Sequence, residues 1–250
     1  MNKFVEIGAV KQVRTAIDRA RYLSFPICVT SAPGMGKTTT LLHECKNNNH
    51  VYVEASQAMN SVQGLYKGVL EAFGCSSEKS YIYELKTILK HRVKPGYGET
   101  PKLLIVDEFQ TLSLTLQREL LSLHENLGFP LLLSGNPERL ARTKADKNSY
   151  EQIRSRIGPI VEIYPPSKED CERLGIAYKV EGIDAYKALT AFGCVRSVRD
   201  ICRLLQQSRI FNDGGSIQLR HLEMAGRSLY GSKFRLGDRR STAIKKGKLA

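Results

Sequence analysis

Short apolar segments alternate with segments of helical periodicity over the first two thirds of the chain. The apolar segments are 27–30, 50–54, 102–108, 130–136 and 159–164. Parallel strands that are buried on both faces are nearly all apolar, and helices connect them. The pattern therefore predicts an α/β fold with a five-stranded parallel sheet between layers of helices. In such folds the ligand site lies at the carboxyl ends of the strands.

The helical segments suggest how the chain is divided. An amphipathic helix is expected over 9–22, and further helices at 61–73, 80–91 and 114–127 lie between the strands. Beyond Pro165 and Pro166 only helical segments follow, near 167–178, 182–192, 195–208 and 217–230. We predict an N-terminal lead-in (1–25), an αβα domain (26–164), a small helical domain (165–230) and a flexible basic tail (231–250).

Charge and cysteine content narrow the class of protein. Lys and Arg outnumber Asp and Glu by 38 to 25, which gives a net charge of +13 and favours nucleic acid as a partner. No apolar run reaches the ~18 residues of a membrane span, and the N-terminus has no secretory signal. The six cysteines contain no Cys-x-x-Cys pair, so we expect reduced thiols in a cytoplasmic protein.

The segment Ser31-Ala-Pro-Gly-Met-Gly-Lys-Thr38 lies between a predicted strand and a helix that begins near Thr39. This order is typical of a P-loop, whose backbone N–H groups surround nucleotide phosphates. Lys37 would reach the β and γ oxygens, and the Thr38 hydroxyl would bind Mg²⁺. Ser31 stands where the usual motif has glycine. The expected nucleotide contacts are Pro33, Gly34, Met35, Gly36, Lys37, Thr38 and Thr39.

Two carboxylates follow the strand at 102–108. Asp107 is placed to hold Mg²⁺, and Glu108 to act as the general base toward water. The alternative for this pair is a solvated strand end, which the upstream P-loop makes the weaker interpretation.

Asn136 and the arginines each have two interpretations. Asn136 is either a residue that senses the γ-phosphate or an ordinary turn residue, because Gly-Asn-Pro is good turn chemistry. Arg154 or Arg156 either enters a neighbouring subunit's site as an arginine finger or belongs to an exposed basic face. Arg196 either reaches the phosphates from the helical domain or pairs elsewhere.

Together these motifs resemble the AAA+ ATPases, and within them the phage Mu B-type transposition ATPases. The similar segments are Phe4-Val-Glu6, Gly34-Met-Gly-Lys-Thr38, Ile105-Val-Asp-Glu108, Leu133-Ser-Gly-Asn136 and Ser155-Arg-Ile157. The resemblance covers roughly residues 4–230. It implies an AAA+ αβα sandwich with a helical lid, Arg156 as the finger and Arg196 as the lid sensor.

The resemblance also implies a function. Proteins of this group are ATP-dependent and bind duplex DNA without sequence specificity. They assemble on it as homo-oligomeric rings or filaments, and they deliver the target DNA to a transposase that they stimulate. The Mu protein carries an N-terminal helix-turn-helix domain, whereas this chain starts almost directly at the ATPase core. DNA contact by the basic tail is therefore expected, through Lys233, Arg235, Arg239, Arg240, Lys245 and Lys246. The alternative for this tail is a solvated segment that only keeps the protein soluble.

Other functions remain open at this point. The chain would also suit an AAA+ helicase loader, a secretion-associated ATPase, or a nucleotide switch that binds ATP without hydrolysis. A small-molecule kinase is disfavoured because it would have no use for Arg156, the helical domain or the charge of +13.

Overall fold

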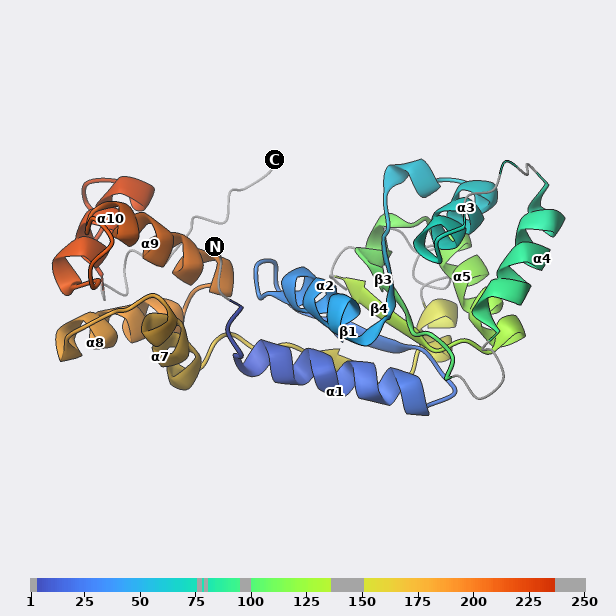
Figure 1. The fold of residues 1–250 in the computed structure, drawn as a ribbon, viewed down its shortest axis with the longest axis horizontal. Helices are drawn as coiled ribbons and strands as arrows, with labels where there is room; N and C mark the ends of the chain where they lie inside the picture. The colour runs from blue at the N-terminus through green and yellow to red at the C-terminus, as the bar shows by residue number, and fades with distance from the viewer. Residues whose placement is uncertain (1–3, 76–77, 79–80, 95–99, 136–150, 237–250) are drawn as a thin grey trace. The chain divides into compact units, whose positions relative to one another are not determined.

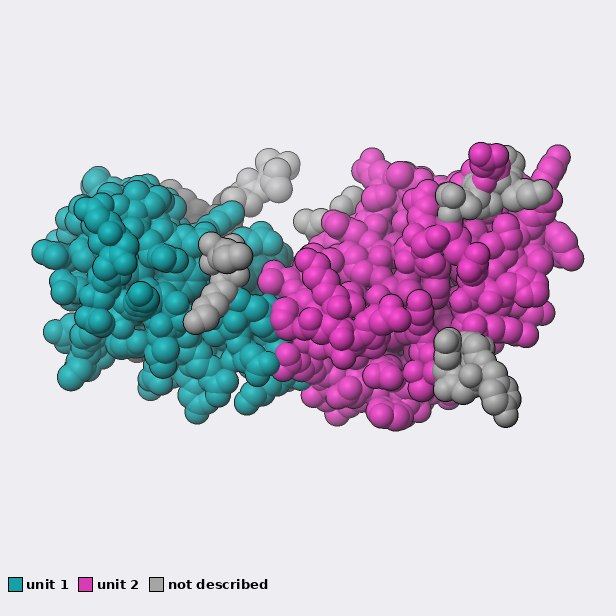
Figure 2. Space-filling model, viewed as in Figure 1, with its two compact units in different colours: residues 1–11, 32–36, 164–250 teal, residues 12–31, 37–163 magenta. Residues whose placement is uncertain are grey.

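The computed structural model describes residues 4–75, 78, 81–94, 100–135 and 151–236 (Figure 1). The chain forms two compact units (Figure 2). Residues 12–31 and 37–163 make up the first, called here the sheet unit. Residues 1–11, 32–36 and 164–250 make up the second, called here the C-terminal unit. Each unit is described by itself.

Five parallel strands form the sheet, as the apolar segments predicted. They are β1 (Ile27–Thr30), β2 (Val51–Glu54), β3 (Leu104–Asp107), β4 (Leu131–Gly135) and β5 (Ile160–Glu162). Their order across the sheet is β2-β3-β4-β1-β5, and all four pairings are parallel. Every residue of β3 and β4 is buried, which is why these strands are apolar throughout.

Alternate strand residues contribute to the core of the sheet unit. Val53, Val106 and Leu133 belong to one apolar cluster together with side chains of the helices that follow β2 and β3. Ile105 and Leu132 project from the other face and are equally inaccessible to water. Both faces of the sheet are therefore covered, as the α/β prediction requires.

Helices lie before and between these strands, and one of them has clear capping residues at both ends. The helices are α1 (Gly8–Tyr22), α2 (Lys37–Asn48), α3 (Val62–Ala72), α4 (Ile82–Val93) and α5 (Leu114–Leu127), with short 3₁₀ turns η1 (Gln57–Met59) and η2 (Phe109–Thr111). The Ser113 hydroxyl accepts from the Leu116 N–H at the start of α5, and Gly128 ends that helix in the left-handed conformation. The predicted limits of α5 are thus confirmed by two local signals.

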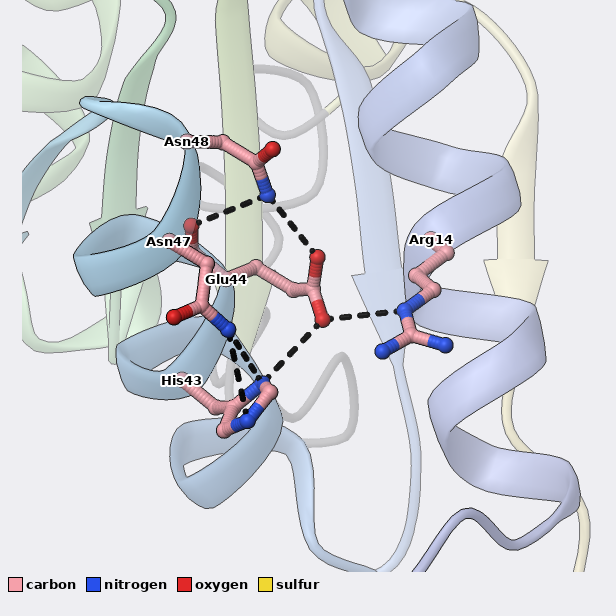
Figure 3. A network of polar contacts seen from close by, with 5 residues as sticks. All are labelled: Arg14, His43, Glu44, Asn47 and Asn48. Carbon is pink, nitrogen blue, oxygen red and sulfur yellow. Dashed lines mark hydrogen bonds and ion pairs between the residues drawn. The ribbon is translucent and has the colours of Figure 1, made fainter.

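A polar network joins α1 to α2 (Figure 3). Arg14 Nε donates to Glu44 Oε1 at 2.9 Å, and Asn48 Nδ2 donates to Glu44 Oε2 at 3.1 Å. The Glu44 side chain is 8% exposed and that of Arg14 is 37% exposed. His43 lies 3.3 Å from the same carboxylate. Because a buried carboxylate needs partners, this network allows Glu44 to lie between the two helices.

Between residues 164 and 236 the C-terminal unit contains four helices: α7 (Lys168–Ala177), α8 (Ile183–Gly193), α9 (Val198–Ile210) and α10 (Leu219–Tyr230). Capping boxes open α7, through Ser167 and Asp170, and α9, through Ser197 and Asp200. The Asp170 carboxylate also accepts the Gly8 N–H at 2.7 Å, which anchors the N-terminal segment to this unit. Among the described helices of the chain, none has both the length and the apolar character needed to cross a membrane.

Candidate nucleotide-binding site

The predicted phosphate-binding loop connects β1, which ends at Thr30, to α2, which begins at Lys37. Gly34 and Gly36 have φ angles of 82° and 92°. Glycine enters this left-handed region without a steric penalty. A Cβ added at Gly34 would in addition lie 2.9 Å from Ser197 Oγ, within the C-terminal unit. The backbone itself therefore requires two of the motif's glycines.

Ser31, the residue that departs from the usual motif, contacts the motif's lysine. Lys37 Nζ donates to Ser31 Oγ at 2.6 Å and lies 3.3 Å from the Ser31 carbonyl oxygen. Glycine at this position would offer the carbonyl oxygen alone. Serine at this position thus adds a hydroxyl that binds the Lys37 ammonium group within the loop. Ser31 itself is buried, with 6% of its surface exposed.

Asp107 lies at the carboxyl end of β3 and is 1% exposed. Its Oδ2 accepts from Thr38 Oγ1 at 2.6 Å and from the Tyr52 hydroxyl at 3.2 Å. Its Oδ1 accepts from the Glu108 N–H at 2.9 Å. The structure therefore brings together Thr38 and Asp107, the two residues predicted to hold a metal ion, although 69 positions separate them in the chain.

Tyr52 was not among the predicted site residues. Burial, followed by the nearby Asp107 charge, raises the pKa of its phenol well above the usual range. The phenol therefore stays protonated at neutral pH, and its hydroxyl is a donor to the carboxylate.

Glu108, the predicted general base, has a left-handed backbone with φ 51° and ψ 35°. This conformation is uncommon for a residue other than glycine and turns the chain sharply out of β3 into η2. The Gln110 side-chain amide donates to the Glu108 carboxylate. A Cβ on Gly135, in β4, would collide with Gln110 Oε1, so Gln110 packs directly against the end of that strand.

The two candidate finger residues have different surroundings. Residues 151–156 are helical, and Arg154 is exposed. Arg156 makes two hydrogen bonds to the Glu125 carboxylate of α5, through Nε at 2.7 Å and through Nη2. These bonds hold the pKa of Glu125 below its usual range and raise the pKa of Arg156. Arg156 is thus half-buried in an ion pair within its own sheet unit.

Arg196, the predicted lid sensor, lies between two aromatic rings of the C-terminal unit. Its guanidinium carbon is 5.6 Å from the Phe192 ring centroid and 5.3 Å from that of Tyr230. Phe234 joins the two rings in one aromatic cluster. These cation–π contacts connect α8 to α10. Arg196 thus has aromatic partners within its own unit, and a role toward phosphate stays a prediction.

Some of the other predicted site residues lie outside the described ranges. Asn136 does, as do four of the basic residues assigned to DNA contact, namely Arg239, Arg240, Lys245 and Lys246. Lys233 and Arg235 are exposed on either side of Phe234, which is 7% exposed. The first residues of the predicted tail are therefore packed against the C-terminal unit through Phe234.

The sequence of this chain is similar to those of known ATP-dependent proteins. A family model described as an AAA domain matches residues 25–143. The chain is 24% identical over 215 residues to the Mu-like prophage FluMu DNA transposition protein B of Haemophilus influenzae, covering 84% of this chain and 73% of that protein. It is 26% identical over 183 residues to the ATP-dependent target DNA activator B of Escherichia phage Mu. Residues 25–143 thus match an AAA domain, and the chain resembles the Mu B-type DNA transposition proteins. The match covers 72% of this chain and only 57% of the phage Mu protein.

Solved structures agree on the fold of this AAA+ ATPase. The ORC2 protein of Aeropyrum pernix aligns with a TM-score of 0.59 at 17% identity, covering 87% of this chain and 66% of that one. The RuvB Holliday junction branch migration motor of Thermotoga maritima aligns with a TM-score of 0.55 at 19% identity, covering 90% and 70%. At these identities the likeness is one of fold.

Sequence reasoning missed three residues around the candidate site. They are Tyr52, Gln110 and Glu125, which contact Asp107, Glu108 and Arg156 respectively. The position of Gln110, two residues after the predicted base Glu108, was a usable local signal. Tyr52 and Glu125 are distant in the chain from their partners, so only strand order and helix packing reveal them.

Proposed function

We propose that this AAA+ ATPase binds ATP together with Mg²⁺ at the carboxyl ends of β1 and β3. Lys37 would exchange its contact with Ser31 for the β and γ oxygens of the nucleotide, and Arg196 would contribute from the lid. Thr38 and Asp107 offer a hydroxyl and a carboxylate 2.6 Å apart, and Mg²⁺ prefers such hard oxygen ligands. The ion would supply neutralisation of phosphate charge.

Glu108 is the proposed general base. Its carboxylate is held by Gln110, so it must be released or rotated to polarise the attacking water. Asn136 is the proposed γ-phosphate sensor. These roles agree with the ATPase class of the chain and with the position of Glu108 directly after the buried end of β3.

Arg156 is the proposed finger that acts on a neighbouring subunit's nucleotide, with Arg154 as its exposed neighbour. In an isolated chain Arg156 pairs with Glu125, so assembly would have to exchange that partner for phosphate. The ATPase would then turn over efficiently only as a homo-oligomer.

The proposed biological role is ATP-dependent binding of duplex DNA without sequence specificity. The protein would oligomerise on DNA as a ring or helical filament, deliver the target to a partner transposase and stimulate it. The observation that carries this proposal is the similarity, over 72–84% of this chain, to proteins named for DNA transposition and target DNA activation. The net charge of +13 adds to it, because phosphate neutralisation dominates nonspecific DNA affinity.

Electron microscopy with duplex DNA tests the proposal. We expect ordered oligomers on DNA with a non-hydrolysable ATP analogue, and few or none with ADP or without nucleotide. A Lys37→Ala variant is the matched control, since it removes the phosphate-binding ammonium and should behave like the nucleotide-free protein. DNA affinity that is the same with ATP, with ADP and without nucleotide would exclude the mechanism.

A further inference from the structure

The Asp107 carboxylate has most of its hydrogen-bonding capacity in use. An ionised carboxylate has about four acceptor positions. Among the described residues, Thr38 and Tyr52 use Oδ2, and the Glu108 N–H uses Oδ1. The remaining position is thus on Oδ1.

Tyr52 reaches this carboxylate because of the strand register. β2 pairs with β3 so that Tyr52 lies opposite Ile105 and Glu54 lies opposite Asp107. Asp107 is therefore the diagonal neighbour of Tyr52 on the same face, two residues further along, within the reach of an aromatic side chain. The half-buried phenol spans this distance and ends 3.2 Å from Oδ2.

The surroundings also explain why a donor is useful here. Glu54, directly opposite Asp107, carries the same charge, and like charges at opposite positions of paired strands repel. The neutral hydroxyl of Tyr52 supplies Asp107 with a hydrogen bond without adding to that repulsion. It also restricts rotation of the Asp107 carboxylate, because it adds a second side-chain donor to Oδ2 beside Thr38.

We propose that Tyr52 is a positioning residue for the metal-linked carboxylate. Its hydroxyl fixes Oδ2 of Asp107 beside Thr38, so that the remaining acceptor position on Oδ1 would serve hydrated Mg²⁺. The inference rests on the proposed use of Mg²⁺, and Tyr52 lies on β2, outside the P-loop. Groups that orient a metal's ligands from outside the coordination shell typically contribute 10–100-fold to metal affinity.

Tyr52→Phe is the direct test, since it removes the hydroxyl and keeps the ring. The Mg²⁺ concentration for half-maximal ATP hydrolysis should rise about tenfold, at the lower end of that range because the bond is 3.2 Å long. At saturating Mg²⁺ the turnover number should stay within about twofold of the wild type, because Tyr52 would act through ion affinity. A fluorescent ATP analogue should bind the variant as it binds the wild type in EDTA and more weakly at limiting Mg²⁺.

Tyr66→Phe is a matched control. Tyr66, on α3, donates its hydroxyl to Glu119 Oε1 of α5 at 2.7 Å, the same chemistry in the same unit but in another place. Its Mg²⁺ dependence should equal that of the wild type. An equal shift in both variants, or weaker analogue binding by Tyr52→Phe in EDTA, would mean a merely structural role and overturn the inference.

Two further outcomes separate the inference from the proposal it rests on. If the wild type binds and hydrolyses ATP equally well without a divalent cation, the proposed Mg²⁺ site is wrong and the inference fails with it. If the wild type needs Mg²⁺ and Tyr52→Phe needs the same concentration, only the inference about Tyr52 is wrong.

Discussion

Arg14→Ala should destabilise the sheet unit by about 2 kcal/mol. The substitution leaves the Glu44 carboxylate, 8% exposed, without the guanidinium that lies 2.9 Å away. Hydrogen bonds to charged groups contribute about 1.5–3 kcal/mol, and breaking a fully buried ion pair costs about 3–5 kcal/mol. Because Arg14 is 37% exposed and Asn48 still donates to Glu44, the expected loss lies in the lower range.

Urea denaturation followed by far-ultraviolet circular dichroism measures the effect, since the chain has no tryptophan. With a denaturant slope of about 2 kcal/mol per molar, the midpoint of the sheet unit should fall by roughly 1 M. Arg19→Ala is the matched control, because Arg19 lies on the exposed side of the same helix. Its free energy of unfolding should change by no more than about 0.5 kcal/mol.

A double-mutant cycle with Glu44→Ala isolates the pair itself. We expect a coupling free energy of roughly 1–2 kcal/mol between Arg14 and Glu44. A coupling below about 0.5 kcal/mol, or equal midpoints for Arg14→Ala and Arg19→Ala, would refute the view that this network stabilises the contact between α1 and α2.

Three other changes have defined outcomes. Glu108→Gln should keep equilibrium ATP binding and lower phosphate release by about 10²–10⁴-fold; normal turnover would exclude Glu108 as the base. Arg156→Ala should lower DNA-stimulated hydrolysis by about 10³-fold or more, whereas Glu125→Ala, which removes its partner, should change it only a few-fold; equal losses would argue against a finger. Burial and, to a lesser degree, the charge of Arg21 lower the pKa of His50 from its ordinary value of 6.5. The unfolded chain therefore takes up the proton at a higher pH than the folded chain, and the free energy of unfolding should fall as the pH decreases through 6.5. Urea midpoints at pH 7.5 and 5.5 should differ less in His50→Gln, and an unchanged difference would contradict this assignment.

The sequence was sufficient for elements whose signals are local. The five apolar segments correspond to the five strands, because a strand that is covered on both faces is apolar at nearly every position. The helix at 114–127 was predicted at its observed limits, since Ser113 and Gly128 are strong capping residues. The contact of Thr38 with Asp107 followed from the rule that strand ends meet at one edge of the sheet.

What the sequence did not reveal depends on contacts between distant segments. The role of Tyr52 requires β2 to lie beside β3 in one register, and several strand orders are compatible with the same apolar pattern. The pairing of Arg156 with Glu125 requires the helical turn at 151–156 to lie against α5, and no local motif encodes that. The effect of Ser31 depends on the rotamer of Lys37.

The hydrogen bond between Gly8 and Asp170 has a consequence for synthesis. The two residues are 162 positions apart, and ribosomes add about 5–20 residues per second, so Gly8 is made roughly 8–30 s before its acceptor. During that interval β1 to β4 are also made, so these strands can begin to pair before Gly8 has its acceptor. The N-terminal segment can dock through this hydrogen bond only once α7 has emerged.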